Sequence, residues 1–284
     1  MSIRKAFVVA FISVFCLIPS LLLAQEEAVP AQVEQKAAPV QVDQKASPAQ
    51  VEQKAAPPTL EDKIKQMDKL WVERYKKDYS QKGLDYSRTL YKEVPDNYDV
   101  AWRMARAAFW VAEHSKSDKQ MEKLGKEGYN AGLKAIKINS EGIDGYYFGS
   151  AALGQYATGS GILKALFKGL GNKYEKMCKK ALKIDRRHDW AGPLRAIGRY
   201  WYSLPKIKRD LDKSTKYLEE AITVAPLNLR NHAYLADTYL EDDKKAKAIE
   251  QYKICAEGDP RKNDYADAIL QKKYCAGKLK ELVK

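Results

Sequence analysis

The sequence predicts an all-α protein, built as a TPR-like α-solenoid of about five helix pairs with a C-terminal capping helix. Two observations support this prediction. From Thr59 onward, apolar residues recur every three or four positions, which is the period of an amphipathic helix. Small residues and prolines then return at matching places in successive segments, as in stacked helical repeats. A charged fraction of 31% and a hydrophobic fraction of 45% fit a globular protein rather than a disordered one.

The first residues predict a secretory signal peptide over residues 1–24. Arg4 and Lys5 precede an apolar run that ends at Leu23, and Ala24 follows as the cleavage position. The run is close to the roughly 20 apolar residues that cross a bilayer, so an uncleaved segment would tether the protein to the membrane. We expect an exported, periplasmic protein in either case.

Residues 25–58 predict a disordered linker. A proline recurs every nine residues from Pro30 to Pro57 among Ala, Gln and Val, and the segment contains no aromatic residue. Such a composition cannot build a core. The linker would either hold the folded part away from a membrane or be an inert tail. The helical domain is expected to span residues 59–284.

The clearest repeat lies between Pro226 and Pro260, which are 34 residues apart. Its first helix shows a large–small–large pattern, its second helix shows a small–large–small pattern, and a proline closes the unit. The residues in these positions are Leu235, Ala236, Tyr239, Ala248, Tyr252 and Cys255. This is the pattern of the tetratricopeptide repeat (TPR), in which small residues let two helices approach closely.

Four looser helix pairs precede this unit. The segments that pair are 67–71 with 84–97, 101–114 with the helix around Gly128, Gly132 and Ala135, 144–156 with 174–185, and 191–202 with 213–226, and the apolar stripe of the first helix runs from Leu60 to Tyr79. A glycine inside a helix costs about 1 kcal/mol relative to alanine. The glycines at 128 and 132 therefore predict that their helix packs closely against a neighbour. A capping helix begins at about Asp264.

One connection, residues 157–172, is longer than a usual repeat turn. It follows a helix and lacks the Gly-Lys-Ser/Thr ending of a phosphate loop. Lysines alternate with apolar residues in it, which predicts a short amphipathic helix. This helix would either cover the solenoid's own core or contact a partner, a ligand or a membrane surface. The contact residues would be Ile162, Leu163, Leu166 and Phe167.

A family resemblance is carried by three segments between Ala101 and Pro260: "AWRMARAAFWVAEH", "GLKAIKINSEGIDGYYFGSAALGQYA" and "GILKALFKGLGNKYEKMCKKALKIDRRHDWAGPLRAIGRYWYSLP". They resemble the TPR subunit (T-component) associated with TRAP transporters, the tripartite ATP-independent periplasmic transporters. The Gly-Ile-Leu-Lys segment also resembles the regulator of microtubule dynamics family. The chain lacks the lipid-attachment cysteine that is frequent in T-components.

The resemblance to the T-component implies a periplasmic, non-enzymatic helical protein. Such a protein would act beside a periplasmic solute-binding protein, handle a small apolar or carboxylated ligand, and form a homo-oligomer. The alternative is a cell-envelope scaffold that assembles other proteins and binds no small molecule.

Repeat geometry predicts a binding site. The first helices of a TPR superhelix line its concave surface, and Ile197 is taken as the Leu position of its repeat. The side chains that would then face the groove include Arg103, Trp110, Tyr147, Arg195, Arg199, Tyr202 and Asp237. Arginines beside aromatic rings would clamp a carboxylate over an apolar floor. Alternatively, Arg195 and Arg199 pair with acids inside the solenoid.

No motif predicts catalysis. The three histidines are isolated along the chain, and neither a metal-ligand spacing nor a nucleophile motif occurs. We therefore expect neither enzyme activity nor a bound metal or cofactor.

Three cysteines follow the signal peptide, namely Cys178, Cys255 and Cys275. A tight turn near Asp259 would leave Cys255 and Cys275 about 16 Å apart in height along antiparallel helices. A disulfide needs Cα atoms within about 7 Å of each other. The sequence therefore predicts three free, buried thiols.

The formal net charge of the chain is +13, and much of it is concentrated in residues 162–188, which contain nine Lys or Arg residues and only two acidic residues. Nucleic acid is not an expected partner of an exported protein. An acidic protein, an anionic lipid or an acidic solute fits this charge, unless the lysines serve only to keep exposed helix faces soluble.

Overall fold

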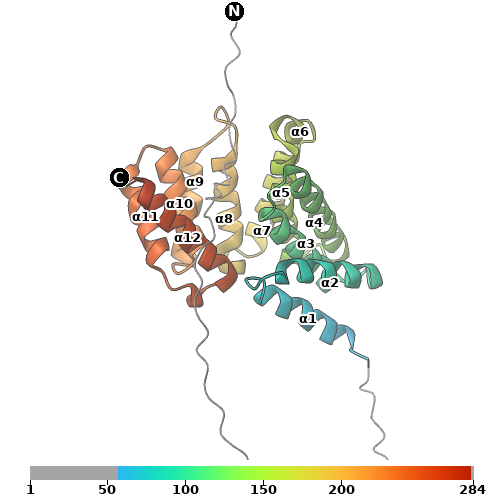
Figure 1. Ribbon diagram of the computed structural model, residues 1–284. Coiled ribbons are helices and arrows are strands. Elements are labelled where there is room, and N and C mark those ends of the chain that lie inside the picture. Colours follow the sequence, from blue (N-terminus) through green and yellow to red (C-terminus); the bar gives the residue numbers. More distant parts are fainter. Residues whose placement is uncertain (1–56, 283–284) are drawn as a thin grey trace, which may run out of the picture. The chain divides into compact units, whose positions relative to one another are not determined.

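The computed structural model describes residues 57–282, which fold into a helical unit that begins at Pro58 (Figure 1). The Thr59 hydroxyl accepts a hydrogen bond from the Asp62 amide and so caps the first helix, which starts at Leu60. The predicted signal peptide and nearly all of the predicted linker lie outside the described residues. Within residues 57–282, no helix is both long enough and apolar enough to cross a membrane.

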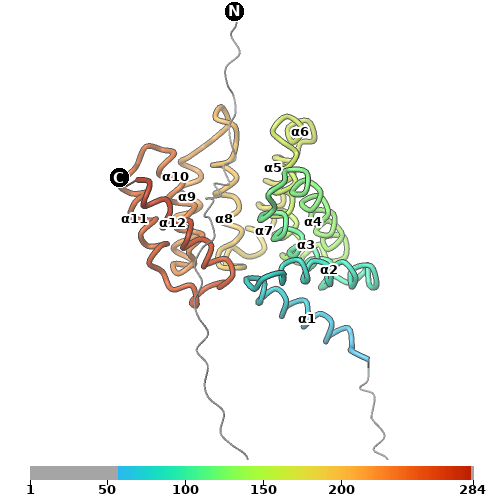
Figure 2. The backbone as a smooth tube through the Cα atoms, in the orientation of Figure 1, coloured from blue at the N-terminus to red at the C-terminus, as the bar shows by residue number. Residues whose placement is uncertain are grey.

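The described residues form five helix pairs and a final helix, which confirms the predicted α-solenoid. The pairs are α1 (Leu60–Val72) with α2 (Tyr79–Glu93), α3 (Tyr98–Glu113) with α4 (Asp118–Ile138), α5 (Ile143–Ser160) with α7 (Leu170–Ile184), α8 (His188–Ser203) with α9 (Leu211–Val224), and α10 (Leu229–Glu241) with α11 (Lys245–Glu257). The short helix α6 (Ile162–Phe167) is inserted in the third pair, and a 3₁₀ turn (Pro260–Lys262) leads into α12 (Tyr265–Leu282). Figure 2 shows the same path as a continuous tube.

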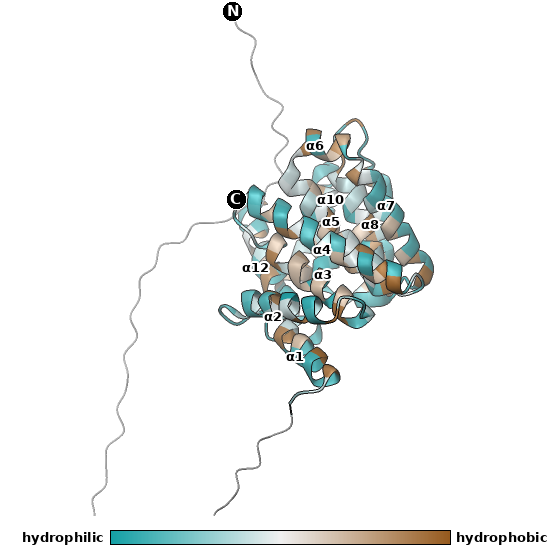
Figure 3. Ribbon diagram, turned by 90° about the vertical axis from the view of Figure 1, so that its right-hand side faces the viewer, coloured by the Kyte–Doolittle hydropathy of each residue, from teal (hydrophilic) through white to brown (hydrophobic). Residues whose placement is uncertain are grey.

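The residues that carry the repeat pattern form the core of the last pair. Leu235, Ala236 and Tyr239 on α10 are buried together with Ala248 and Tyr252 on α11. Ala236 and Ala248 are completely inaccessible to solvent. Hydrophobic and hydrophilic residues alternate along the helices, as expected of amphipathic helices (Figure 3).

The predicted close packing at the glycine face occurs between α4 and α5. A Cβ atom added to Gly132 would lie 2.4 Å from the Cα atom of Gly149. One added to Gly128 would lie 2.8 Å from the Cβ atom of Ala152. The missing side chains therefore allow the two helix backbones to touch.

The first helix ends earlier than its apolar stripe predicts. The stripe extends to Tyr79, but α1 stops at Val72 and α2 starts at Tyr79. Arg74 Nη1 donates to the Trp71 carbonyl oxygen at 2.8 Å, which satisfies an acceptor at the helix end. Asp78 then takes a left-handed conformation, with φ at 63°, and the chain turns.

The C-terminal helices contact the first two helix pairs and the link between α1 and α2 through three side-chain pairs. Arg230 on α10 donates to Glu113, at the end of α3, at 2.7 Å. It also donates to Asp267 on α12 at 3.0 Å. The link between α1 and α2 reaches the start of α12, where the Tyr75 and Tyr265 rings lie 5.0 Å apart. We call the three pairs that join the two parts the closing contacts: Arg230–Glu113, Tyr75–Tyr265 and Arg74–Asp264.

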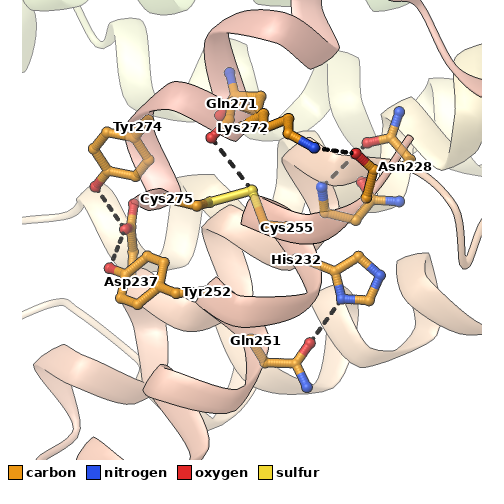
Figure 4. Close-up of a disulfide and its surroundings, with 12 residues drawn as sticks. Asn228, His232, Asp237, Gln251, Tyr252, Cys255, Gln271, Lys272, Tyr274 and Cys275 are labelled. Carbon is orange, nitrogen blue, oxygen red and sulfur yellow. Dashed lines mark hydrogen bonds between the residues drawn. A yellow bond between two sulfur atoms is a disulfide. The ribbon is translucent and has the colours of Figure 1, made fainter. Parts of the chain in front are cut away.

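Cys255 and Cys275 form a disulfide, so the prediction of free thiols was wrong for this pair (Figure 4). Their Cα atoms lie 6.0 Å apart. The prediction assumed a tight turn near Asp259, but the connection runs over residues 258–264 and includes the 3₁₀ turn. This longer connection lets α12 begin beyond the end of α11, so the two cysteines come level.

Cys178 is a free, buried cysteine, as predicted. Burial raises the pKa of its thiol to about 12, so the thiol stays protonated at neutral pH and is a poor nucleophile.

Candidate functional site

Arg195 and Tyr147 meet inside the solenoid, where Arg195 Nη2 lies 2.9 Å from Tyr147 Oη. The same guanidinium donates to Asn231 Oδ1 and to the Trp190 carbonyl oxygen, both at 3.1 Å. Burial raises the pKa of Tyr147 well above its ordinary value, so its hydroxyl keeps its proton and donates to Asp189 at 2.5 Å.

These contacts hold an unusual turn at the start of α8. Asp189, Trp190 and Ala191 have φ angles of 48°, 57° and 63°, and none of them is glycine. Left-handed backbone costs about 1–2 kcal/mol for each such residue. Asn231 Nδ2 and Arg195 both donate to the carbonyl oxygen of Trp190 and so offset part of this cost. Arg195 thus pairs within the solenoid, as the alternative interpretation expected.

Arg199 is also paired internally. Its Nη1 lies 2.8 Å from Asp237 Oδ2, and its guanidinium is stacked between the rings of Tyr202 and Tyr234. Tyr252 donates to the second oxygen of Asp237 at 2.7 Å. The structure thus brings Arg199, Tyr202 and Asp237 together, with the carboxylate already occupied. A role for them in ligand binding stays a prediction.

Arg103 lies on α3, apart from those two clusters. It pairs with Asp68 of α1 at 2.9 Å and with Asp99 at 2.8 Å. It lines a cavity of only about 20 Å³, together with Arg106 and Arg74. Burial lowers the pKa of Arg106 to about 10, so this side chain remains charged at neutral pH.

The α6 residues predicted to make contacts are exposed. Leu163 is 70% exposed and Phe167 is 90% exposed, and none of the residues from Ile162 to Phe167 is buried. Only Ala165 is half-buried, beside the core of the third pair. The four predicted contact residues are thus accessible, and a role for them in contacting a partner, a ligand or a membrane surface stays a prediction.

A larger cleft lies where α12 approaches the first two helix pairs. Its volume is about 470 Å³, within the range of about 300–1,000 Å³ that is usual for small-molecule sites. We call it the α3–α12 cleft. It is lined by Arg74, Tyr75, Ser80, Trp110, Val111, His114, Ser115, Lys116, Gln120, Ala266, Ile269 and Leu270. Of the predicted site residues, only Trp110 lines it.

The wall of the cleft combines apolar rings with cations. Trp110 Nε1 donates to Ser80 Oγ at 3.1 Å, and the His114 ring packs 4.2 Å from the Trp110 ring. His114 Nδ1 lies 2.8 Å from the Trp110 carbonyl oxygen. Because a carbonyl oxygen only accepts, Nδ1 carries the proton and Nε2 is left for another partner.

Arg74 is the buried cation of this wall. Its guanidinium lies 3.6 Å from the Trp71 ring centre and 4.2 Å from that of Trp110. Burial lowers its pKa, and the Asp264 carboxylate acts in the opposite direction. Its Nε atom is buried without a hydrogen-bond partner.

Sequence reasoning missed Arg74 and His114 because both lie outside the repeat template, at the end of a helix or in the link after it. The sequence signal that could have found them is the aromatic enrichment around Trp71 and Trp110. Among residues 57–282, no group of three or more His, Cys, Asp or Glu side chains could hold a metal ion.

Comparisons with known proteins agree with this fold. The family model described as "Regulator of microtubule dynamics protein 1-3" matches residues 63–209. No curated protein matches the chain. TTC0263, a thermophilic TPR protein of Thermus thermophilus, is similar with a TM-score of 0.57 and 17% identity, over 75% of this chain and 98% of that chain. At this identity the likeness shows the fold alone.

Two further solved structures are more distant. MamA has a TM-score of 0.44 and 12% identity, over 78% of this chain and 99% of that chain. The human IFIT1 dimer with PPP-AAAA has a TM-score of 0.39 and 16% identity, over 80% of this chain and 64% of that chain.

Proposed function

The chain belongs to the regulator of microtubule dynamics protein 1-3 family, and from this premise we propose that it is a TPR-type binding protein whose α3–α12 cleft takes a small, partly apolar anionic molecule. The ligand class is inferred from the side chains that line the cleft. Trp110, Ile269 and Leu270 offer apolar surface, whereas Arg74 offers a cation with a hydrogen-bond donor. No group-transfer chemistry is part of this proposal.

The observation that carries the proposal is the state of Arg74. This cation is fixed between two tryptophan rings, and its Nε donor lacks an acceptor. A carboxylate is the acceptor that a guanidinium binds best, and it binds more tightly where water is excluded. An apolar body attached to that carboxylate would lie along Trp110 and Leu270.

The proposed place of action is the periplasm. The signal peptide predicted over residues 1–24 supports export. The Cys255–Cys275 disulfide also supports it, because disulfides persist in oxidising compartments and are rare in the cytosol. Fractionation of cells that make the chain, with detection in the periplasmic and membrane fractions, tests this placement.

A transport-accessory role is the finer part of the proposal. It rests on the resemblance of the three segments to the T-component, and it predicts a solute-binding protein as neighbour. Chemical crosslinking in intact cells, followed by purification of the full chain, would recover that partner. Recovery of other envelope proteins alone would argue against a transport role.

A protein-only scaffold is the second candidate function. It is favoured by the open rim of the cleft, where Tyr75 is 46% exposed and Leu270 is 39% exposed. An acidic chain end of a partner protein can enter such an opening. In that case the cleft binds polypeptide and retains no small molecule.

Native mass spectrometry of the protein from its own cells tests the ligand proposal. We expect a mass excess that disappears on denaturation, and the same spectrum reports whether the chain forms a homo-oligomer. Leu270→Glu places a negative charge at the rim and should abolish the excess. Leu133→Glu is the matched control, because Leu133 is 42% exposed on α4 and does not line the cleft.

A binding assay with 1-anilinonaphthalene-8-sulfonate complements this measurement, because the probe joins an apolar ring system to one negative charge. We expect the protein to bind it, Leu270→Glu to weaken the binding, and Leu133→Glu to leave it unchanged. If both variants bind the probe equally well and native mass spectrometry detects no released ligand, the ligand proposal is wrong and the protein-only scaffold is the better interpretation.

A further inference from the structure

Two turns project from the same end of the folded unit. One is α6 with its flanking residues, 161–169, and the other is the link between α8 and α9, residues 204–210. Both lie at the top of Figures 1 and 3, which are views at right angles. They belong to consecutive helix pairs, and in stacked helix pairs the internal turns follow one edge, which is often a binding face.

The sequence builds both turns to stand out from the body. Gly161 and Gly169 have φ angles of 77° and 60°, values that favour glycine, and they let the chain leave α5 and enter α7 with α6 between them. In the second turn, Pro205 follows the end of α8 and its missing N–H cannot continue a helix. Apart from the half-buried Ala165, neither projection contributes to the core.

Large apolar side chains occupy the tips of both turns. Leu163, Leu166 and Phe167 are 70%, 65% and 90% exposed on α6. Ile207 is 93% exposed at the tip of the second turn. A monomer gains nothing by exposing such a group of side chains, so their gathering at one end indicates a surface that is covered in use.

Basic residues surround these tips, and acids are absent from residues 161–169 and 204–209. Lys206 and Lys208 flank Ile207 and are exposed, without an ion pair among the described residues. On α6, Lys164 pairs with Glu122, and Lys168 donates to Tyr156 Oη at 2.7 Å.

The chemistry of this end favours lipid over protein as the occupant. Protein interfaces are depleted in lysine relative to the rest of the surface. A bilayer interface accepts both parts, because apolar side chains enter the acyl boundary while lysines reach the phosphate groups. We propose that the end formed by α6 and residues 204–210 docks on the surface of a bilayer that contains anionic phospholipid.

The docking end is independent of the α3–α12 cleft, since none of the residues that line the cleft belongs to either turn. Failure of the ligand proposal would leave the docking proposal standing, and the reverse also holds.

Hydrogen–deuterium exchange of the full chain is the first test, because it locates the contact whatever the N-terminal segment does. Vesicles of phosphatidylcholine mixed with phosphatidylglycerol should protect residues 161–169 and 204–210. Vesicles of phosphatidylcholine alone should protect them much less, since the basic residues then lose their partners. Equal exchange of both segments with and without the anionic vesicles would overturn the proposal.

A variant test follows by vesicle flotation. Leu163→Gln, Phe167→Gln and Ile207→Gln combined should weaken binding to the anionic vesicles about tenfold or more, because each removes insertable apolar surface. Leu227→Gln is the matched control, since Leu227 is 53% exposed in the link between α9 and α10. All four sites are exposed, so the fold tolerates the changes.

One further outcome would assign the end to a different occupant. If both segments become protected without lipid as the protein concentration rises, and the triple variant abolishes that protection, the end is an interface between two copies of the chain and the membrane proposal is wrong.

Discussion

Arg195 is surrounded by acceptors that belong to the protein itself, and its side chain supports a turn of three left-handed residues. Replacing it with methionine would leave the Asp189 carboxylate and the Trp190 carbonyl oxygen with fewer partners. We expect Arg195→Met to lower the free energy of unfolding by about 3–5 kcal/mol. Urea titration followed by circular dichroism measures this change.

The control for this variant is Arg261→Met, because Arg261 is exposed and pairs only with its neighbour Asp259. Its unfolding midpoint should equal that of the parent protein. If Arg195→Met also unfolds at the parent midpoint, the guanidinium does not support the turn, and Arg195 becomes available again as a ligand-binding residue.

Asp267 makes stability depend on pH in the acid range. Burial acts to raise the pKa of its carboxyl, but Arg230 acts in the opposite direction and the pKa lies below the ordinary value of 3.8. A carboxyl whose pKa falls on folding stabilises the protein above its unfolded pKa and loses that effect as pH falls. Urea midpoints should therefore drop below about pH 4, and more steeply in the parent than in Asp267→Asn. Parallel curves would contradict this assignment.

The α4–α5 contact makes an unusual prediction about glycine. Alanine is the better helix former, yet Gly132→Ala should lower the free energy of unfolding by about 1–3 kcal/mol, because a Cβ atom would overlap the Gly149 backbone. Gly277→Ala is the opposite case, since nothing lies within 4 Å of an added Cβ atom on α12. It should stabilise by up to about 1 kcal/mol. The midpoints of thermal unfolding of both variants test these two predictions. A Gly132→Ala variant as stable as the parent would show that α4 and α5 can move apart to accommodate a Cβ atom.

The helices themselves could be predicted because their signals are local. The three-to-four-residue period and the small residues at 128, 132, 236 and 248 depend only on neighbours along the chain, and all of these residues lie in the predicted helices. The start of α12 at Tyr265 agrees with the capping helix expected at about Asp264, but the end of α1 and the position of α12 along α11 could not be predicted in the same way. These two features depend on the Arg74 contact and on the length of the 258–264 connection, and neither of them produces a periodic pattern in the sequence.

The site was less predictable than the fold for a related reason. The repeat template names positions on first helices, and of the residues it assigned to the concave groove only Trp110 lines the cleft. The other cleft residues come from links, from α2, α4 and α12, or from positions on α3 that the template does not name. The template also assumes an empty groove, whereas Arg195 and Arg199 are paired with groups of the protein itself.

The disulfide links the final helix to the fifth pair, across a sequence separation of 20 residues. The loop-closure entropy of a ring of this size corresponds to about 3 kcal/mol of stability. We expect Cys255→Ser combined with Cys275→Ser to lower the free energy of unfolding by about that amount. A thiol reductant should destabilise the parent equally and leave the double variant unchanged. If the reductant leaves the free energy of unfolding of the parent protein unchanged, Cys255 and Cys275 are not joined by a disulfide.

The closing contacts also affect the order in which the chain can finish folding. In an open repeat array each unit contacts only its nearest neighbours, so it can complete its folding as soon as the next unit has been synthesised. In this protein Glu113 can form its ion pair only after Arg230 has been synthesised. Arg74 can form its ion pair only after Asp264, which lies 190 residues later in the sequence. A chain synthesised from its N-terminus therefore exposes the acceptor and donor groups of its first helices until the last helix has been made.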